Sequence, residues 1–134
     1  MPSHRSLLQL AATVFGAVFV AVAVIGFVQG DTVLGVFEVD ALHNVIHLAS
    51  GLAALAAASS GRTSRLYFLG FGAVYALVAA IGFVDGDTVL GLFDVNAADN
   101  VLHLVIAAAT LALGLALSDE PRGASRGRAP AVAG

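Results

Sequence analysis

Long apolar stretches alternate with short polar segments along this chain. The four apolar stretches cover residues 7–28, about 41–58, 66–84 and about 97–117. Each has roughly 18–22 residues, which as a helix spans the hydrocarbon core of a bilayer, about 30 Å. Because backbone polar groups inside a bilayer must pair within the chain, we predict that all four are helices. All three prolines lie outside them.

The pattern repeats after 56 residues. Residues 10–58 align without a gap with residues 66–114, and 27 of these 49 positions are identical. The hexapeptide GDTVLG occurs at 30–35 and again at 86–91. Such a repeat indicates that one unit, a helix, an outer loop and a second helix, is present twice, over about residues 7–60 and 63–117. Since each unit crosses twice, the units are parallel, and we predict an all-α, four-helix antiparallel transmembrane bundle.

Composition agrees with a membrane protein. Hydrophobic residues make up 59% of the chain and charged residues 11%, whereas soluble domains carry about 25% charged residues. A chain this short cannot bury so much apolar surface in one water-soluble core, so lipid must act as the solvent. The absence of cysteine excludes disulfides, thiolate metal sites and a cysteine nucleophile.

The charged residues are sorted by position. The basic residues lie near the two ends and in the connector between the units, namely Arg5, Arg62, Arg65, Arg122, Arg126 and Arg128. The loops at 29–40 and 85–96 contain acidic residues and no basic one. By the positive-inside rule, the transmembrane domain over residues 1–118 has both termini and its connector in the cytoplasm and its two acidic loops outside. Residues 119–134 are predicted to be a disordered cytoplasmic tail.

The repeated outer loop combines glycine, aspartate and apolar residues. Its matched positions are Gly30, Asp31, Gly35, Gly86, Asp87 and Gly91. Gly30 can turn the chain out of the first helix, Asp31 or Thr32 can cap a short turn of helix, and Gly35 can end that turn. We expect each loop to fold back with its apolar side chains against the bundle end. This favours a sealing lid over a binding or gating loop.

Polar side chains recur within the second helix of each unit. They are Asn44 and His47, repeated as Asn100 and His103, with His43 in the first unit and Asp99 at the matching position of the second. The spacing N-x-x-H places both side chains on one helix face. Polar residues at this depth face the bundle interior and are candidates for function.

Three interpretations of these residues remain open. The favoured one is structural, with neutral histidines and interhelical hydrogen bonds. In the second, His47 and His103 lie at equivalent depths and hold a haem or a metal ion. In the third, the two histidines handle protons or ions beside Asp99 and Asp40, which would require an oligomer. The sequence contains no nucleophile constellation and no phosphate-binding loop, so neither an enzyme nor a nucleic-acid-binding protein is predicted.

The doubled unit, with its GFV-x-GD turn, its LG-x-F loop and the N-x-x-H motif that opens the second helix, resembles the bacterial domain-of-unknown-function 4383 family over roughly residues 5–118. The resemblance implies a small protein that crosses the bacterial plasma membrane four times, and it implies no activity. We therefore expect a non-enzymatic structural or interaction role without a cofactor, whose partners are the lipid bilayer and further copies or other membrane proteins. The alternatives are a haem- or metal-binding, redox-linked protein and a subunit of a small oligomeric channel or transporter.

Overall fold

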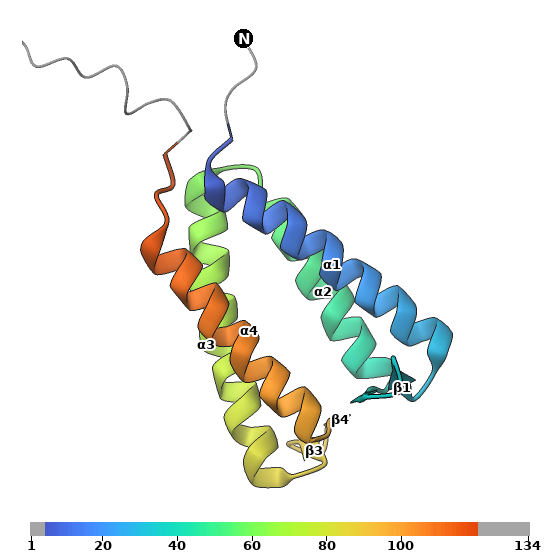
Figure 1. The fold of residues 1–134 in the computed structure, drawn as a ribbon. Coiled ribbons are helices and arrows are strands. Elements are labelled where there is room, and N and C mark those ends of the chain that lie inside the picture. The colour runs from blue at the N-terminus through green and yellow to red at the C-terminus, as the bar shows by residue number, and fades with distance from the viewer. Residues whose placement is uncertain (1–4, 121–134) are drawn as a thin grey trace, which may run out of the picture.

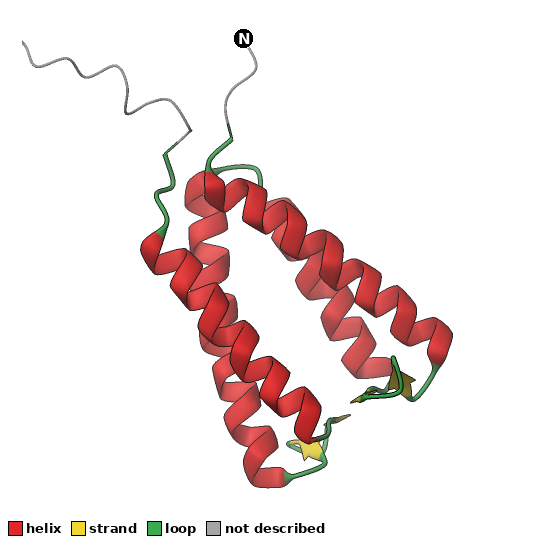
Figure 2. Cartoon of the chain, viewed as in Figure 1, coloured by secondary structure: helices red, strands yellow, loops and turns green. Residues whose placement is uncertain are grey.

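A computed structural model describes residues 5–120, and within them the chain is helical apart from two small hairpins (Figures 1 and 2). The elements are α1 (Leu7–Gln29), β1 (Thr32–Val33), β2 (Phe37–Glu38), α2 (Ala41–Ala57), α3 (Gly61–Asp85), β3 (Thr88–Val89), β4 (Phe93–Asp94) and α4 (Ala97–Ala116). The all-α class is confirmed. Of the predicted tail, residues 121–134 lie outside the described residues.

Local signals fix where the helices begin and end. Ser6 caps α1 and forms a capping box with Gln9, and α1 ends at Gly30, whose φ of 90° is in the left-handed region. Asp40 and Asn96 cap α2 and α4. Helix α3 begins at Gly61, earlier than the predicted residue 66, because Ser60 caps it. Helices α1, α3 and α4 are long and apolar enough to cross a membrane, and α2 is a shorter apolar helix.

The helices lie in two pairs, α1 beside α2 and α3 beside α4 (Figure 1). At the end near the termini the pairs meet around Leu8, Ala12, Ala58 and Phe68. Further along, aromatic rings fill the centre. Phe15 lies edge-on to Phe71 at 5.0 Å between ring centroids, and Phe71 stacks on Tyr75 at 3.9 Å. This aromatic layer closes the middle of the protein below the hairpins.

The two glycine–aspartate loops, which follow α1 and α3, form hairpins, so the predicted short helical turn after Asp31 is wrong. Strand β1 pairs with β2 in antiparallel fashion, Val33 opposite Phe37, and β3 pairs with β4 in the same way. The physical reason lies in the turn, where Leu34 and Gly35 have φ of 54° and 67°. Two consecutive left-handed residues make a turn whose twist suits a hairpin and cannot continue a right-handed helix.

Both hairpins fold back between the helix pairs. In the first, Val33 and Val39 are buried, and the hairpin lines the space between α1 and α4. In the second, Val89, Phe93 and Val95 form a small core with Ile46 of α2 and with two residues of α3. Each hairpin therefore packs against the first helix of its own unit and the second helix of the other unit.

Candidate functional site

Hydrogen bonds join the hairpin of each unit to the helix start of the other unit. The Asp40 carboxylate accepts from the backbone N–H of His43 at 2.7 Å and from that of Asp94, in the other hairpin, at 2.8 Å. The Asp99 carboxylate accepts from the N–H groups of Asn96 and Glu38, both at 2.9 Å. We call these two carboxylates, Asp40 and Asp99, the crossed clasp. They join the hairpin ends of the two helix pairs.

The clasp makes a testable contribution to stability. We expect Asp99→Ala to lower the free energy of unfolding by about 1–3 kcal/mol, because the part-buried amides of Glu38 and Asn96 lose their acceptor. The measurement is chemical or thermal unfolding followed by circular dichroism in detergent. Asp31→Ala is the control, since that carboxylate is exposed in the segment between α1 and the first hairpin. Equal losses in the two variants would contradict the role given to Asp99.

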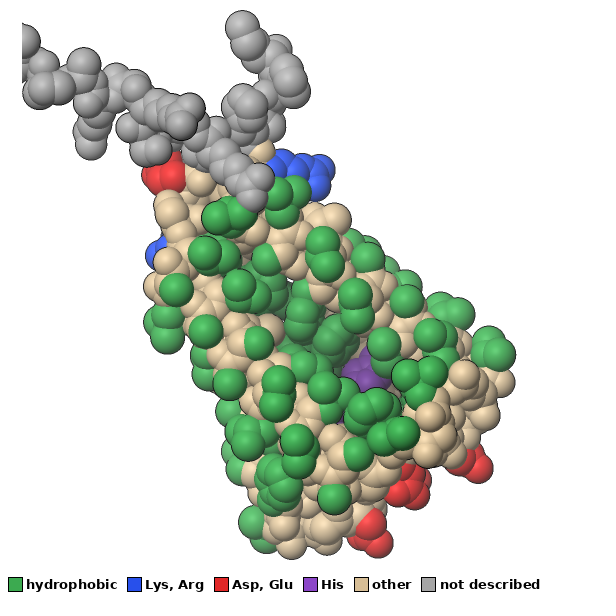
Figure 3. All heavy atoms as spheres, viewed as in Figure 1, with side chains coloured by type: hydrophobic (Ala, Val, Ile, Leu, Met, Phe, Trp, Pro, Cys, Tyr) green, Lys and Arg blue, Asp and Glu red, His purple; other side chains and the backbone are tan. Residues whose placement is uncertain are grey.

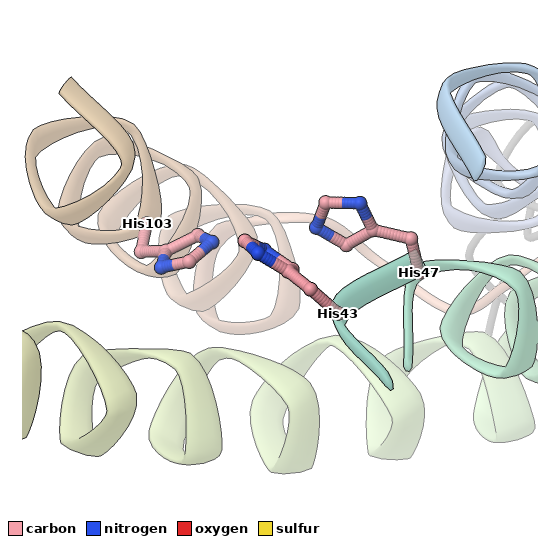
Figure 4. Close-up of side chains that lie close together, drawn as sticks. All are labelled: His43, His47 and His103. Carbon is pink, nitrogen blue, oxygen red and sulfur yellow. The ribbon is translucent and has the colours of Figure 1, made fainter. Parts of the chain in front are cut away.

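Three histidines meet just below the clasp. His43 and His47 project from α2, one turn apart, and His103 projects from α4 towards them (Figure 4). The centroid of the His43 ring lies 4.6 Å from that of His47 and 5.6 Å from that of His103, and the other two rings are 6.4 Å apart. The three side chains are 1%, 9% and 4% exposed. The sequence named all three histidines as candidates and paired His47 with His103, and in the structure His43 lies between these two rings.

The proton on one of these rings can be assigned. His43 Nδ1 lies 2.8 Å from the carbonyl oxygen of Asp94. A carbonyl only accepts, so Nδ1 carries the proton and Nε2 has a free lone pair. This Nε2 is buried without a hydrogen-bond partner among the described residues, as are Nδ1 of His47 and Nδ1 of His103. One ring nitrogen from each histidine lies within 4.8 Å of the others, an arrangement that can hold a metal ion.

The repeated asparagines serve a different purpose. The side-chain oxygens of Asn44 and Asn100 are buried without a hydrogen-bond partner among the described residues. A Cβ added at Gly26 would overlap the Asn44 amide, and one added at Gly82 would overlap the Asn100 amide. Each asparagine thus packs directly on the backbone of the neighbouring helix. The N-x-x-H motif therefore combines a helix-packing residue with a member of the histidine cluster.

Two grooves reach the histidine cluster. The groove between α1 and α4 has a volume of about 210 Å³, and His47, Asp99 and His103 are among its lining residues. Figure 3 shows this face, with histidine atoms visible in the hollow. The groove between α2 and α3 is larger, about 560 Å³, and is lined by His43 and His103. The cluster is covered by hairpins on one side and by the aromatic layer on the other, so these grooves are its lateral openings.

The repeated loop residues stay outside the cluster. Gly30, Gly35, Gly86 and Gly91 have φ between 66° and 94° and shape the hairpins. Asp31 and Asp87 are exposed. The sequence named both His43 and Asp99 among the candidates. It did not predict the contact of His43 with the Asp94 carbonyl in the other hairpin, and no spacing within one helix signals that contact.

Comparisons with known proteins give one family. The model of the domain of unknown function DUF4383 matches residues 9–116, which confirms the resemblance seen in the sequence. No curated protein and no solved structure matches the chain.

Proposed function

The chain belongs to the DUF4383 family, a domain of unknown function, and we propose a function from the site itself. The protein binds a transition metal ion through His43, His47 and His103. One observation carries the proposal. Three buried imidazoles each keep a nitrogen without a hydrogen-bond partner among the described residues, and their ligand atoms lie within 4.8 Å of one another. Burying such nitrogens is costly unless something binds them.

The donor set suits zinc or copper. Imidazole nitrogens ligate both metals, and the chain has no thiolate to offer. Nitrogens bound tetrahedrally at zinc lie about 3.4 Å apart, so ring nitrogens that lie within 4.8 Å of one another need to approach by no more than about 1.4 Å. The backbone carbonyl of Asp94 accepts a hydrogen bond from His43 Nδ1 and so orients the ring, as carbonyls beside metal-bound histidines commonly do. Asp99, on the α1/α4 groove, supplies a negative charge near the site.

The same geometry favours a metal ion over a haem. Two axial histidines need an empty plane between them for the porphyrin. Here His43 occupies the space between His47 and His103, 4.6 Å and 5.6 Å from their ring centroids. The cluster therefore leaves no room for a macrocycle without moving α2.

The proposed setting is the bacterial plasma membrane, crossed four times with both termini in the cytoplasm. Helix α2 has 17 residues, a length of about 26 Å, and lies along α1, which supports a fourth crossing. The described arginines, Arg5, Arg62 and Arg65, all lie at the end opposite the hairpins. The metal then lies near the outer surface, below the hairpins, in a binding protein rather than an enzyme.

Metal titration of the detergent-purified protein tests the proposal. We expect one zinc or copper ion per chain by mass spectrometry of the metal content, and a loss of affinity of at least about 100-fold in His47→Ala/His103→Ala. The matched control is His4→Ala, which replaces the one histidine of the sequence outside the cluster. This variant should bind the metal as the wild type does. Metal-free protein after loading with both metals, or equal retention by the double variant, would reject the proposal.

A further inference from the structure

The two grooves occupy matched places in the repeat, yet their volumes are about 560 Å³ and 210 Å³. The difference comes from smaller residues along the α2/α3 groove. Under the 56-residue shift, Gly70 replaces Val14, Ala49 stands where the second unit has Val105, and Ser50 stands where it has Ile106. All three small residues line the larger groove. The α2/α3 groove is thus enlarged at these three positions.

Gly70 leaves space that no protein atom fills. A Cβ added at this glycine would meet no atom within 4 Å. Several other helix glycines of this protein are in tight contact, for example Gly72 with Leu111 and Thr110. Close helix packing therefore does not explain Gly70, whereas an opening for a bound molecule does.

The surroundings of the groove indicate what can enter. Leu66 and Val74 line it and are 59% and 57% exposed, so its mouth lies on the apolar flank of α3. A molecule arriving there must be soluble in lipid. Further in, the walls carry aromatic rings of Phe71, Tyr75 and Phe93. Such walls favour a flat ring, since aromatic pairs stack or meet edge to face.

The inner end of the groove is polar. It is lined by His43 and His103. His43 Nδ1 donates a hydrogen bond to the backbone carbonyl of Asp94, which leaves Nε2 of the neutral ring as an acceptor without a donor among the described residues. The missing partner is a hydrogen-bond donor. A volume of about 560 Å³ is within the usual range of small-molecule sites, about 300–1,000 Å³.

We propose that the α2/α3 groove binds a lipid-soluble ring compound that carries a hydroxyl group, the chemistry of a quinol, with the hydroxyl at the histidine cluster and the apolar tail towards the bilayer. This site goes beyond the proposed metal function and does not require a metal, because His43 Nε2, buried without a hydrogen-bond partner among the described residues, can accept from the hydroxyl once the ring enters the groove.

The test compares decylubiquinol with decylubiquinone, which has the same tail but no ring hydroxyl, on the protein in lipid nanodiscs with EDTA. We expect saturable retention of one quinol per chain, at least 5-fold weaker retention of the quinone, and at least 10-fold weaker quinol retention by Gly70→Phe. Val14→Phe is the matched control, since Val14 is exposed at the equivalent position, and it should bind as the wild type does. Gly70→Val adds a smaller side chain and should weaken quinol retention by less than Gly70→Phe does.

Three results would overturn the proposal: retention no greater than that of empty nanodiscs, equal retention of quinol and quinone, or unchanged binding in Gly70→Phe. The first would mean that only lipid chains fill the groove. Zinc titration of Gly70→Phe, expected to match the wild type, separates this outcome from a failure of the metal site.

Discussion

Gly26→Val and Gly82→Val should each destabilise the protein by about 3 kcal/mol, because a side chain at either position overlaps an asparagine that has nowhere to move. Asn44 and Asn100 are 3% and 2% exposed, and each fills the space that its glycine leaves open. The two glycines belong to different helix pairs, so we expect the losses to add to about 6 kcal/mol. That is comparable with the whole stability of many domains, about 5–15 kcal/mol.

The measurement is unfolding in detergent, with recovery of monodisperse protein as a second readout. Gly70→Val is the control in the same helix as Gly82, because an added side chain there meets open space. It should be neutral or slightly stabilising, since valine forms helices better than glycine does. If all three variants lose the same stability, the need for glycine at positions 26 and 82 does not come from their contacts with Asn44 and Asn100.

Replacing His47 and His103 by leucine should make the protein more stable than the wild type without metal and less stable than the wild type with zinc. In metal-free protein, His47→Leu/His103→Leu should raise the free energy of unfolding by about 1–3 kcal/mol, because two buried nitrogens without partners are replaced by apolar groups of similar size. At a zinc concentration about 1,000 times the dissociation constant, the wild type gains about 4 kcal/mol and the variant gains nothing. The order of stability then reverses.

Unfolding of both proteins in EDTA and in zinc checks this. His47→Gln/His103→Gln is a useful companion, because it keeps polar side chains while weakening ligation, and it should show neither the gain without metal nor the gain with it. If the wild type is more stable in EDTA than His47→Leu/His103→Leu, burying the two imidazoles does not destabilise the metal-free protein. Equal stabilisation by zinc in both would show that the metal binds elsewhere.

Much of the fold follows from the sequence, and for identifiable reasons. Apolar length and caps such as Ser6 and Asn96 are local signals, so the helix positions could be predicted to within a few residues. The hairpins could not, because the prediction required knowing that Leu34, a residue that rarely adopts positive φ, does so here. The hairpin contacts that hold it form only after the two helix pairs meet.

The site was predictable in part. Depth and periodicity brought His47 and His103 together, since matched positions in a repeat lie at matched heights. The central place of His43 depends on the approach of α2 to the other hairpin, where the backbone carbonyl of Asp94 accepts a hydrogen bond from the ring, and no spacing within one helix encodes that contact. For Gly70 the sequence gives the signal and the structure gives its meaning. The alignment of the two units shows it as a departure from Val14, but only the structure reveals the groove.

The crossed clasp also has an evolutionary consequence. A single unit, helix, hairpin and helix, would leave the backbone amide at position 38 or 94 without the carboxylate that it now finds in the other unit. Two copies of one ancestral unit could satisfy both amides as a symmetric homodimer. Such a dimer must carry the same residue on both sides of its axis. Joining the copies into one chain removes that constraint, and His43 opposite Asp99, like Gly70 opposite Val14, is a difference that a symmetric homodimer could not carry.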